Sequence, residues 1–280
     1  MTTAPIVQTE RPSKAKPANL LKAPPIAWPT ILLHSVTWLA WLGVLSSSLL
    51  GLLNPWIALV VNSVLAFVLF TPMHDASHKS ATRSKRPNEI IGRMAAMGIH
   101  APFPAFRYLH LQHHKHTNHE HEDPDMWAGR GPWFVLPLRW LTQDLHYYAF
   151  YFSKWSQRPK AERRETAATL VLTTLLIAGL MWWTSPLVVL LSWLIPARLA
   201  VAALSYSFDY LPHKPHHVTS KQDRYTATSV RPTAWMTPVL LYQNYHLVHH
   251  LYPGVPFYRY AMVWRDKEGV LRKRGAKVIE

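Results

Sequence analysis

Histidines at helical spacings are the residues of this sequence that could do chemistry. The central group lies in residues 108–125 and contains six of them: His110, His113, His114, His116, His119 and His121. Because residues three and four apart share a helix face, we expect His110, His113 and His114 to point the same way, so that their imidazoles could converge on one ion. Two further groups flank it, and the downstream one repeats the central spacing: His74 and His78 upstream, and His246, His249 and His250 downstream.

The number of histidines predicts a site for two metal ions. Neutral imidazole is a good ligand for Fe, Zn, Cu and Ni. A zinc site takes three or four protein ligands, so eight imidazoles are enough for two ions. Surface histidines in a basic, RNA-like segment would have no fixed spacing, yet the two larger groups share one pattern. We therefore expect catalytic and metal-binding roles for eight residues: His74, His78, His110, His113, His114, His246, His249 and His250.

The remaining histidines have separate interpretations. His213, which we include in the metal set, and His217 follow the last apolar run, and each is a candidate ninth ligand. His116 lies off the helical face of His114, which favours a supporting or substrate-facing role, with ligation as the alternative. We expect His119 and His121 to be solvated. Buried, hydrogen-bonded structural roles are expected for three others: His34, His100 and His146.

Carboxylates and amides near the groups are candidates to orient the ligands. A metal-bound imidazole usually donates its second ring N–H to a carboxylate or a carbonyl. The chain has only 15 acidic residues, and several lie close to the histidines. The expected partners are four aspartates and two asparagines: Asp75, Asp123, Asp125, Asp209, Asn118 and Asn244.

Two stretches without Lys, Arg, Asp or Glu must position these residues. They cover residues 23–74 and 166–197. At about 20 residues per crossing the first is long enough for two crossings, and the second is long enough when the apolar residues up to Phe208 are added. Asn54-Pro55 and Thr184-Ser185-Pro186 predict tight turns between the crossings. We expect membrane spans at about 30–50, 56–73, 167–183 and 187–208. The first span is too long for a signal-peptide core, and a second span follows it directly.

The predicted fold is an all-α integral membrane protein with two transmembrane hairpins. A cytoplasmic helical cap would carry the histidine groups. Residues 133–155 are aromatic but interrupted by Pro137, Arg139 and Asp144, which favours one helix in the membrane interface. Arg198, near the end of the fourth span, is either functional or extended toward the interface. The predicted divisions are a disordered basic tail at 1–25, a membrane domain at 26–262 and a basic tail at 263–280.

The distribution of charge predicts the orientation. The net charge is +15, yet the two hairpin turns carry no Lys or Arg. The positive-inside rule therefore places the termini and all histidine groups in the cytoplasm, as expected for a bacterial inner-membrane protein. Nucleic-acid binding is not expected, because the basic residues flank membrane spans.

The absence of cysteine excludes disulfides, zinc–thiolate sites and an internal iron–sulfur cluster. The sequence also has no flavin or haem motif. If the site performs redox chemistry, we expect electrons from a separate donor, and the basic surface would attract an acidic one such as a ferredoxin. A metal centre at the edge of a bundle, among aromatic residues, is placed to oxidise a lipophilic substrate dissolved in the bilayer.

Three segments resemble the histidine boxes of the membrane fatty acid desaturase superfamily, which also includes carotenoid hydroxylases and ketolases. They are His74-Asp-Ala-Ser-His78, His110-Leu-Gln-His-His114 and His246-Leu-Val-His-His250. The resemblance covers about residues 74–260. It implies a non-haem oxidase with two iron ions that uses O2 and external electrons, and it assigns the ligand role to the eight box histidines.

Two further stretches, residues 208–215 and 244–256, look most similar to cyanobacterial-type β-carotene ring hydroxylases and related bacterial desaturases. This favours ring hydroxylation, with desaturation of a fatty acyl chain as the alternative, and it supports His213 as an extra ligand. A non-catalytic metal binder or transporter is the alternative of another class. Such a protein would be expected to carry ligands midway through its spans, whereas the box histidines lie at or beyond the span ends.

Overall fold

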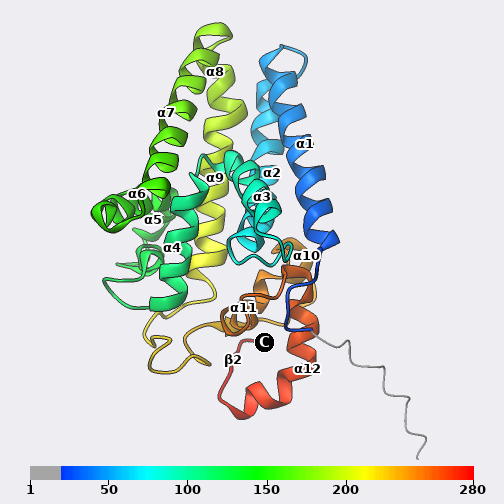
Figure 1. Cartoon of the computed structure of the whole chain (residues 1–280), viewed down its shortest axis with the longest axis vertical. Helices are drawn as coiled ribbons and strands as arrows, with labels where there is room; N and C mark the ends of the chain where they lie inside the picture. The colour runs from blue at the N-terminus through cyan, green and yellow to red at the C-terminus, as the bar shows by residue number, and fades with distance from the viewer. Residues whose placement is uncertain (1–19) are drawn as a thin grey trace, which may run out of the picture.

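Four long apolar helices form the frame of the molecule. The structure, a computed structural model, describes residues 20–280, so most of the predicted N-terminal tail lies outside the described residues. Within them, four helices are long and apolar enough to cross a membrane: α1 (Trp28–Leu49), α2 (Pro55–Ser77), α7 (Lys160–Trp183) and a composite helix, Pro186–Tyr210. They form two hairpins whose turns lie at the same end (Figure 1). The predicted all-α membrane fold is confirmed.

The hairpin turns form where the sequence predicts them. The side chain of Asn54 accepts a hydrogen bond from the N–H of Trp56 at 2.9 Å, and Pro55 occupies the first turn of α2, where its missing N–H costs nothing. Helix α7 begins at Lys160, before the apolar stretch, so its first turns carry charged residues. Arg158 stabilises this start by an ion pair of 2.8 Å with Glu162.

The long helices are unequally buried. Only 6% of the 18-residue apolar stretch of α7 is buried inside the protein, compared with 50% of the corresponding stretch of the composite helix. Leu172 and Leu175 of α7 are exposed, as is Val36 of α1. An apolar surface of this extent is stable in lipid rather than in water.

The composite helix contains two π-helical turns. It consists of α8 (Pro186–Val189), η4 (Leu190–Leu194), α9 (Ile195–Leu204) and η5 (Ser205–Tyr210), of which η4 and η5 are π-helical. Pro196 has no N–H to donate to the carbonyl of Ser192. The buried side chain of Asn62 donates to that carbonyl instead, at 2.8 Å. This bond satisfies a backbone group that water cannot reach.

The aromatic segment at 133–155 forms two helices rather than the predicted one. They are α5 (Leu136–Leu141) and α6 (Gln143–Ser153), and the helix is interrupted at Thr142. The hydroxyl of Thr142 donates back to the carbonyl of Leu138 at 2.8 Å. Arg198 forms an ion pair with Asp144 of α6 and donates to the carbonyl of Leu141 at 2.8 Å. Its guanidinium therefore ties α9 to this segment, and α6 lies across the direction of the long helices (Figure 1).

The shorter helices and strands gather toward the end of the bundle opposite the hairpin turns, and they include the two that carry most of the predicted ligands (Figure 1). They include α3 (Lys85–Ala96), α4 (Phe103–His116), α10 (Met236–Val239), α11 (His246–Leu251) and α12 (Tyr260–Lys273). Short helical turns join them: η1 (Met97–Ile99), η2 (Pro124–Gly129), η3 (Trp155–Gln157), η6 (Gln243–Tyr245) and η7 (Phe257–Arg259). Strands β1 (Ser229–Val230) and β2 (Lys277–Val278) pair in parallel.

Helix α12 belongs to the core of this end. Val263, Trp264 and Leu271 are buried in one apolar cluster with Leu247 and Val248 of α11. The predicted boundary between residues 262 and 263 therefore falls inside a packed helix. Strand β2 then returns the chain to the segment that precedes α10.

Candidate metal centre

Nine histidines form two clusters in which the imidazole nitrogens face one another. In each cluster the candidate ligand atoms all lie within 4.8 Å of one another. The first cluster has five members: His74, His78, His110, His114 and His249. The second cluster has four members: His113, His213, His246 and His250.

Each cluster draws on several elements. The end of α2 supplies His74 and His78, and the turn after η5 supplies His213. Helix α4 supplies two histidines to the first cluster and one to the second, whereas α11 supplies one to the first and two to the second. All the sequence-predicted metal residues are thus brought together, including His213.

The expectation that His110, His113 and His114 all point the same way is wrong. An α-helix turns about 100° per residue, so His110 and His114 point within about 40° of each other, while His113 points about 100° away from His114. His113 faces the second cluster as a result. The same divergence in α11 separates His249 from His246 and His250.

In the first cluster the Nε2 atoms approach one another closely. The Nε2 atom of His249 lies 3.0 Å from that of His74 and 2.8 Å from that of His114. The Nε2 atom of His110 lies 2.7 Å from that of His78 and 3.2 Å from that of His114. Phe70 and Phe106 stack against this cluster, with ring centroids 5.9 Å from His74 and 5.7 Å from His110 respectively.

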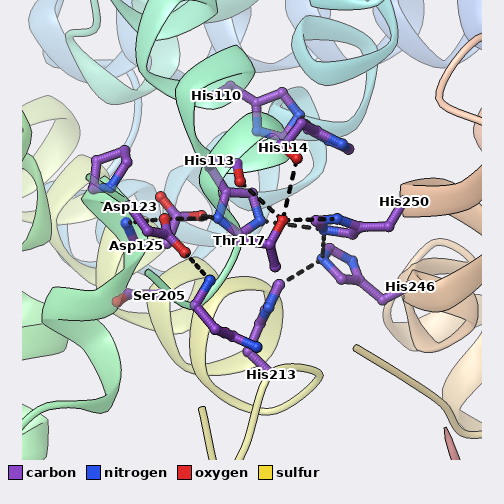
Figure 2. Close-up of polar contacts among 12 residues, drawn as sticks. His110, His113, His114, Thr117, Asp123, Asp125, Ser205, His213, His246 and His250 are labelled. Atoms are coloured by element: carbon purple, nitrogen blue, oxygen red, sulfur yellow. Dashed lines mark hydrogen bonds and ion pairs between the residues drawn. The ribbon is translucent and has the colours of Figure 1, made fainter. Parts of the chain in front are cut away.

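The second cluster has the same arrangement (Figure 2). The Nε2 atom of His246 lies 3.0 Å from that of His213 and 3.0 Å from that of His250. The Nε2 atom of His113 lies 3.2 Å from that of His250. Phe208 of η5 lies between the clusters, with ring centroids 5.0 Å from His74 and 4.8 Å from His246.

These separations fit metal coordination. Two imidazole nitrogens bound to one ion at about 2.1 Å lie about 3.0 Å apart at a right angle and about 3.4 Å apart in a tetrahedron. Four or five nitrogens converging at these distances cannot all be satisfied by hydrogen bonds to one another. The all-imidazole donor set fits Fe, Zn, Cu or Ni.

The surroundings of most of these histidines favour neutral imidazole, the form that binds metals. Burial lowers the pKa of His78 to about 3 and those of His110, His114 and His249 well below the usual range. His113 is different. Burial lowers its pKa, but the charges of Asp123 and Asp125 outweigh this and raise it to about 9. Without a metal, His113 is therefore the cluster member that holds a proton.

Two of the predicted aspartates orient a ligand. The Nδ1–H of His113 donates to Asp123 at 2.9 Å and lies 3.2 Å from Asp125, which in turn accepts from the hydroxyl of Tyr147 at 2.6 Å (Figure 2 shows both aspartates). A further partner of this kind, on His249, was not predicted from the sequence. The Tyr260 hydroxyl lies 2.9 Å from Nδ1 of His249, and nothing in the spacing of Tyr260 identified it.

Three of the other predicted partners bond to backbone groups instead. Asp75 accepts from the Thr30 hydroxyl at 2.7 Å and from the N–H of Phe257 at 3.2 Å, which ties α1 and η7 to the end of α2. Asn118 donates to the carbonyls of residues 218 and 227, and Asn244 donates to that of residue 231. Asp209 lines an apolar cavity next to the clusters.

The remaining histidines lie outside both clusters. His116 is buried and its Nδ1 lies 2.7 Å from Glu122, while His217 is exposed. His216 is buried against Gly129, where a Cβ would lie 2.4 Å from the imidazole. His119 and His121 are not buried, as predicted. Of the three histidines predicted to be buried and hydrogen-bonded, only His34 is buried, and its Nδ1 has no hydrogen-bond partner among the described residues. His100 packs on Trp193 and His146 on Trp127, and both are half-buried.

A mostly apolar cavity adjoins the first cluster. Its apolar wall includes Phe70, Phe106 and Leu204, and Phe70 and Phe106 also contact the clustered histidines. Tyr147 and Asp209 are among its polar lining residues. A lipophilic molecule in this cavity would reach the first cluster past two aromatic rings.

The known proteins that are similar to this chain include a ketolase and several desaturases. A β-carotene ketolase from Paracoccus sp. (strain PC1) is 31% identical over 198 residues, which cover 68% of this chain and 71% of the ketolase. An sn-1 oleoyl-lipid 12-desaturase from Arthrospira platensis is 23% identical over 292 aligned residues, covering 90% and 78% of the two chains.

A chloroplastic sn-2 acyl-lipid omega-3 desaturase (ferredoxin) from Helianthus annuus is 24% identical over 259 residues. That match covers 79% of this chain but only 58% of the Helianthus protein. The family model described as fatty acid desaturase matches residues 50–280, which include all nine clustered histidines. The chain therefore belongs to the fatty acid desaturase family.

Proposed function

We propose that this chain is a membrane oxidase that binds two iron ions and uses O2 to hydroxylate the ring of a β-carotene-type substrate. The observation that carries the proposal is the convergence of nine imidazoles into two adjacent clusters. The first cluster would hold one ion through up to five histidines, and the second would hold another through four. Bound iron would supply the reduction of dioxygen and the attack on an unactivated C–H bond.

The chain itself would bind the substrate and keep the reacting carbon away from water. The mostly apolar cavity is lined by Phe70, Phe106 and Leu204, and the first two of these rings contact His74 and His110 respectively. Phe208 fills the space beside both clusters. The hydrogen bonds from His113 to Asp123 and between His249 and Tyr260 would hold those imidazoles with Nε2 directed at the ions.

A carotenoid ring is favoured by the 31% identity to a protein named β-carotene ketolase. Desaturation of an acyl chain is the second candidate, supported by the similarity to acyl-lipid desaturases over 79–90% of this chain. Both reactions consume one O2, two electrons and two protons. Hydroxylation yields an alcohol and one water, whereas desaturation yields an alkene and two waters.

The proposed setting is a bacterial inner membrane, with the histidine-bearing end in the cytoplasm. This rests on the absence of Lys and Arg from both hairpin turns and on their abundance at the other end. Electrons would come from a separate protein, for which an acidic ferredoxin is the expected type.

Expression in a bacterium that accumulates β-carotene tests the proposal. We expect new hydroxylated pigment in the lipid extract, and none from a His249→Ala variant. New double bonds in the fatty acids with unchanged pigment would instead establish the acyl-chain reaction. A keto pigment would support the proposed carotenoid substrate but show that the product is a ketone rather than an alcohol.

Metal analysis of the purified chain separates both reactions from the alternative of a metal binder or transporter. About two irons per chain are expected for the oxidase. Zinc at variable occupancy, together with no change in pigment or fatty acids, would favour the binder.

A further inference from the structure

Two of the clustered histidines share a pocket that is separate from the apolar cavity. Among the nine, only His78, His114 and His250 are partly exposed, and the other six are buried. His114 and His250 both line a pocket whose other walls are Ser220, Arg224, Ala227, Thr228 and Leu251. The pocket therefore connects the surface directly to both clusters.

The two histidines in the pocket are stacked on each other. Their ring centroids are 4.3 Å apart and the ring planes are inclined by 22°. His114 belongs to the first cluster and His250 to the second. A group that reaches the base of this pocket thus approaches one ligand of each proposed iron ion at the same time.

The pocket is polar and positively charged. Arg224 lines it, and no Asp or Glu is among the lining residues. Lys115 and Lys221, the neighbours in sequence of His114 and Ser220, are exposed. The segment that forms this wall, residues 214–231, contains four Lys or Arg (Lys214, Lys221, Arg224 and Arg231) and one Asp (Asp223). Such a surface attracts acidic partners and is a poor site for an apolar substrate.

We propose that this pocket is the docking site of an acidic, one-electron iron–sulfur protein, and that electrons enter the metal centre through the stacked rings of His114 and His250. The inference rests on the proposed function. Two donor molecules would dock in turn, and each would be oxidised by one electron. Solvent would supply the two protons that accompany these electrons to O2.

The geometry fits a transient electron-transfer complex. Such complexes have small interfaces that form and dissociate quickly, and opposite charges steer the partners together. The substrate cavity lies on other residues, with His114 and His250 absent from its lining. Donor and substrate could therefore bind together without competing.

The test is binding of a reduced [2Fe–2S] ferredoxin to the full chain in lipid nanodiscs. Arg224→Glu is expected to weaken binding roughly tenfold at low salt and to reduce the salt dependence of Kd. Lys221→Glu is expected to act in the same direction. Arg224→Lys, which keeps the charge, is expected to retain most of the affinity.

Arg86→Glu is the matched control. It makes the same change of charge, and Arg86 is exposed on α3 and does not line the pocket. Equal binding by the Arg224→Glu variant and the unchanged chain would overturn the proposal, as would an equal loss with Arg86→Glu. A single turnover tests the proposed function separately: the unchanged chain is reduced by dithionite without air, freed of dithionite and then given O2, and lipid oxidation is measured without a docking protein.

Discussion

At the scale of single residues, the centre depends on which nitrogen of each imidazole is free. The Nε2 atoms face inward in both clusters, so the Nδ1 atoms determine how firmly each ring is held. Asp123 and Tyr260 hold two of these Nδ1 atoms. The role of His213 as a ligand and that of Asp123 as the partner that orients His113 can therefore be tested separately.

Replacing His213 by Ala is expected to reduce the iron content from about two to about one per chain. The second cluster has only four nitrogens, and the variant would leave three. Iron and protein should be quantified in the purified chain. His217→Ala is the control, since His217 is exposed and outside both clusters. Unchanged iron in the His213→Ala variant would remove His213 from the ligand set.

Asp123→Asn is expected to weaken iron binding about 10- to 100-fold, because the amide is a weaker acceptor for the Nδ1–H of His113. Competition with a chelator measures the change in affinity. Glu122→Gln is the control, because Glu122 pairs with His116, which belongs to neither cluster. Equal iron affinity in the two variants would contradict a role for Asp123 in orienting His113.

At the scale of elements, the site is built by helices that must pack at fixed positions. Helix α4 delivers ligands to both clusters, so a shift of α4 would disturb both. Its start is set by Phe103, which packs against Gly92 of α3: a Cβ at residue 92 would lie 2.2 Å from the Phe103 ring. The close approach of α3 and α4 therefore requires glycine at this position.

Gly92→Ala is expected to destabilise the chain by about 1–3 kcal/mol through overpacking, despite the better helix propensity of alanine. Thermal unfolding in detergent would show a lower Tm. Gly43→Ala in α1 is the control, because nothing lies within 4 Å of the added Cβ. Its Tm should be equal or higher. A Tm for Gly92→Ala that matches this control would show that α3 and α4 can move apart without cost.

At the scale of the whole molecule, many imidazoles are buried together at one end. Burial lowers the pKa of His78 to about 3 and those of His100 and His216 to about 4, from 6.5. Below pH 6.5 the unfolded chain therefore binds more protons than the folded chain, and stability falls as the pH falls. His113, with its pKa raised to about 9, affects stability in the opposite direction. Its protonation stabilises the folded chain below pH 6.5, and this stabilisation is lost as the pH rises through 9.

The metal-free chain is accordingly expected to lose stability between pH 6.5 and pH 4, by up to about 1.4 kcal/mol per pH unit for each such histidine. Tm measured at pH 7.5, 6 and 5 checks this. Bound iron would oppose the loss near pH 6, because it binds the folded state only. A Tm of the metal-free chain that is constant over this range would contradict the burial of these groups as neutral imidazoles.

The orientation of the molecule can be tested because the sequence contains no cysteine. Leu52, 78% exposed in the α1–α2 turn, and Lys273, exposed at the end of α12, are suitable positions for single cysteines. In intact cells, a membrane-impermeant maleimide is expected to label Leu52→Cys but not Lys273→Cys. Permeabilised cells should label both. Labelling of Lys273→Cys alone in intact cells would reverse the proposed topology.

The four long helices, their turns and the identity of the candidate ligands could all be predicted from the sequence. These features depend on local properties: uncharged stretches of sufficient length, Asn54-Pro55 at a turn, and histidines at spacings of three and four. Three features became evident only from the packed structure: the division of His113 and His249 between the clusters, the membership of His213 rather than His217, and the contact of Tyr260 with His249. Each of these outcomes depends on how helices distant in sequence pack and rotate against one another, and spacing within one segment carries no information about that packing.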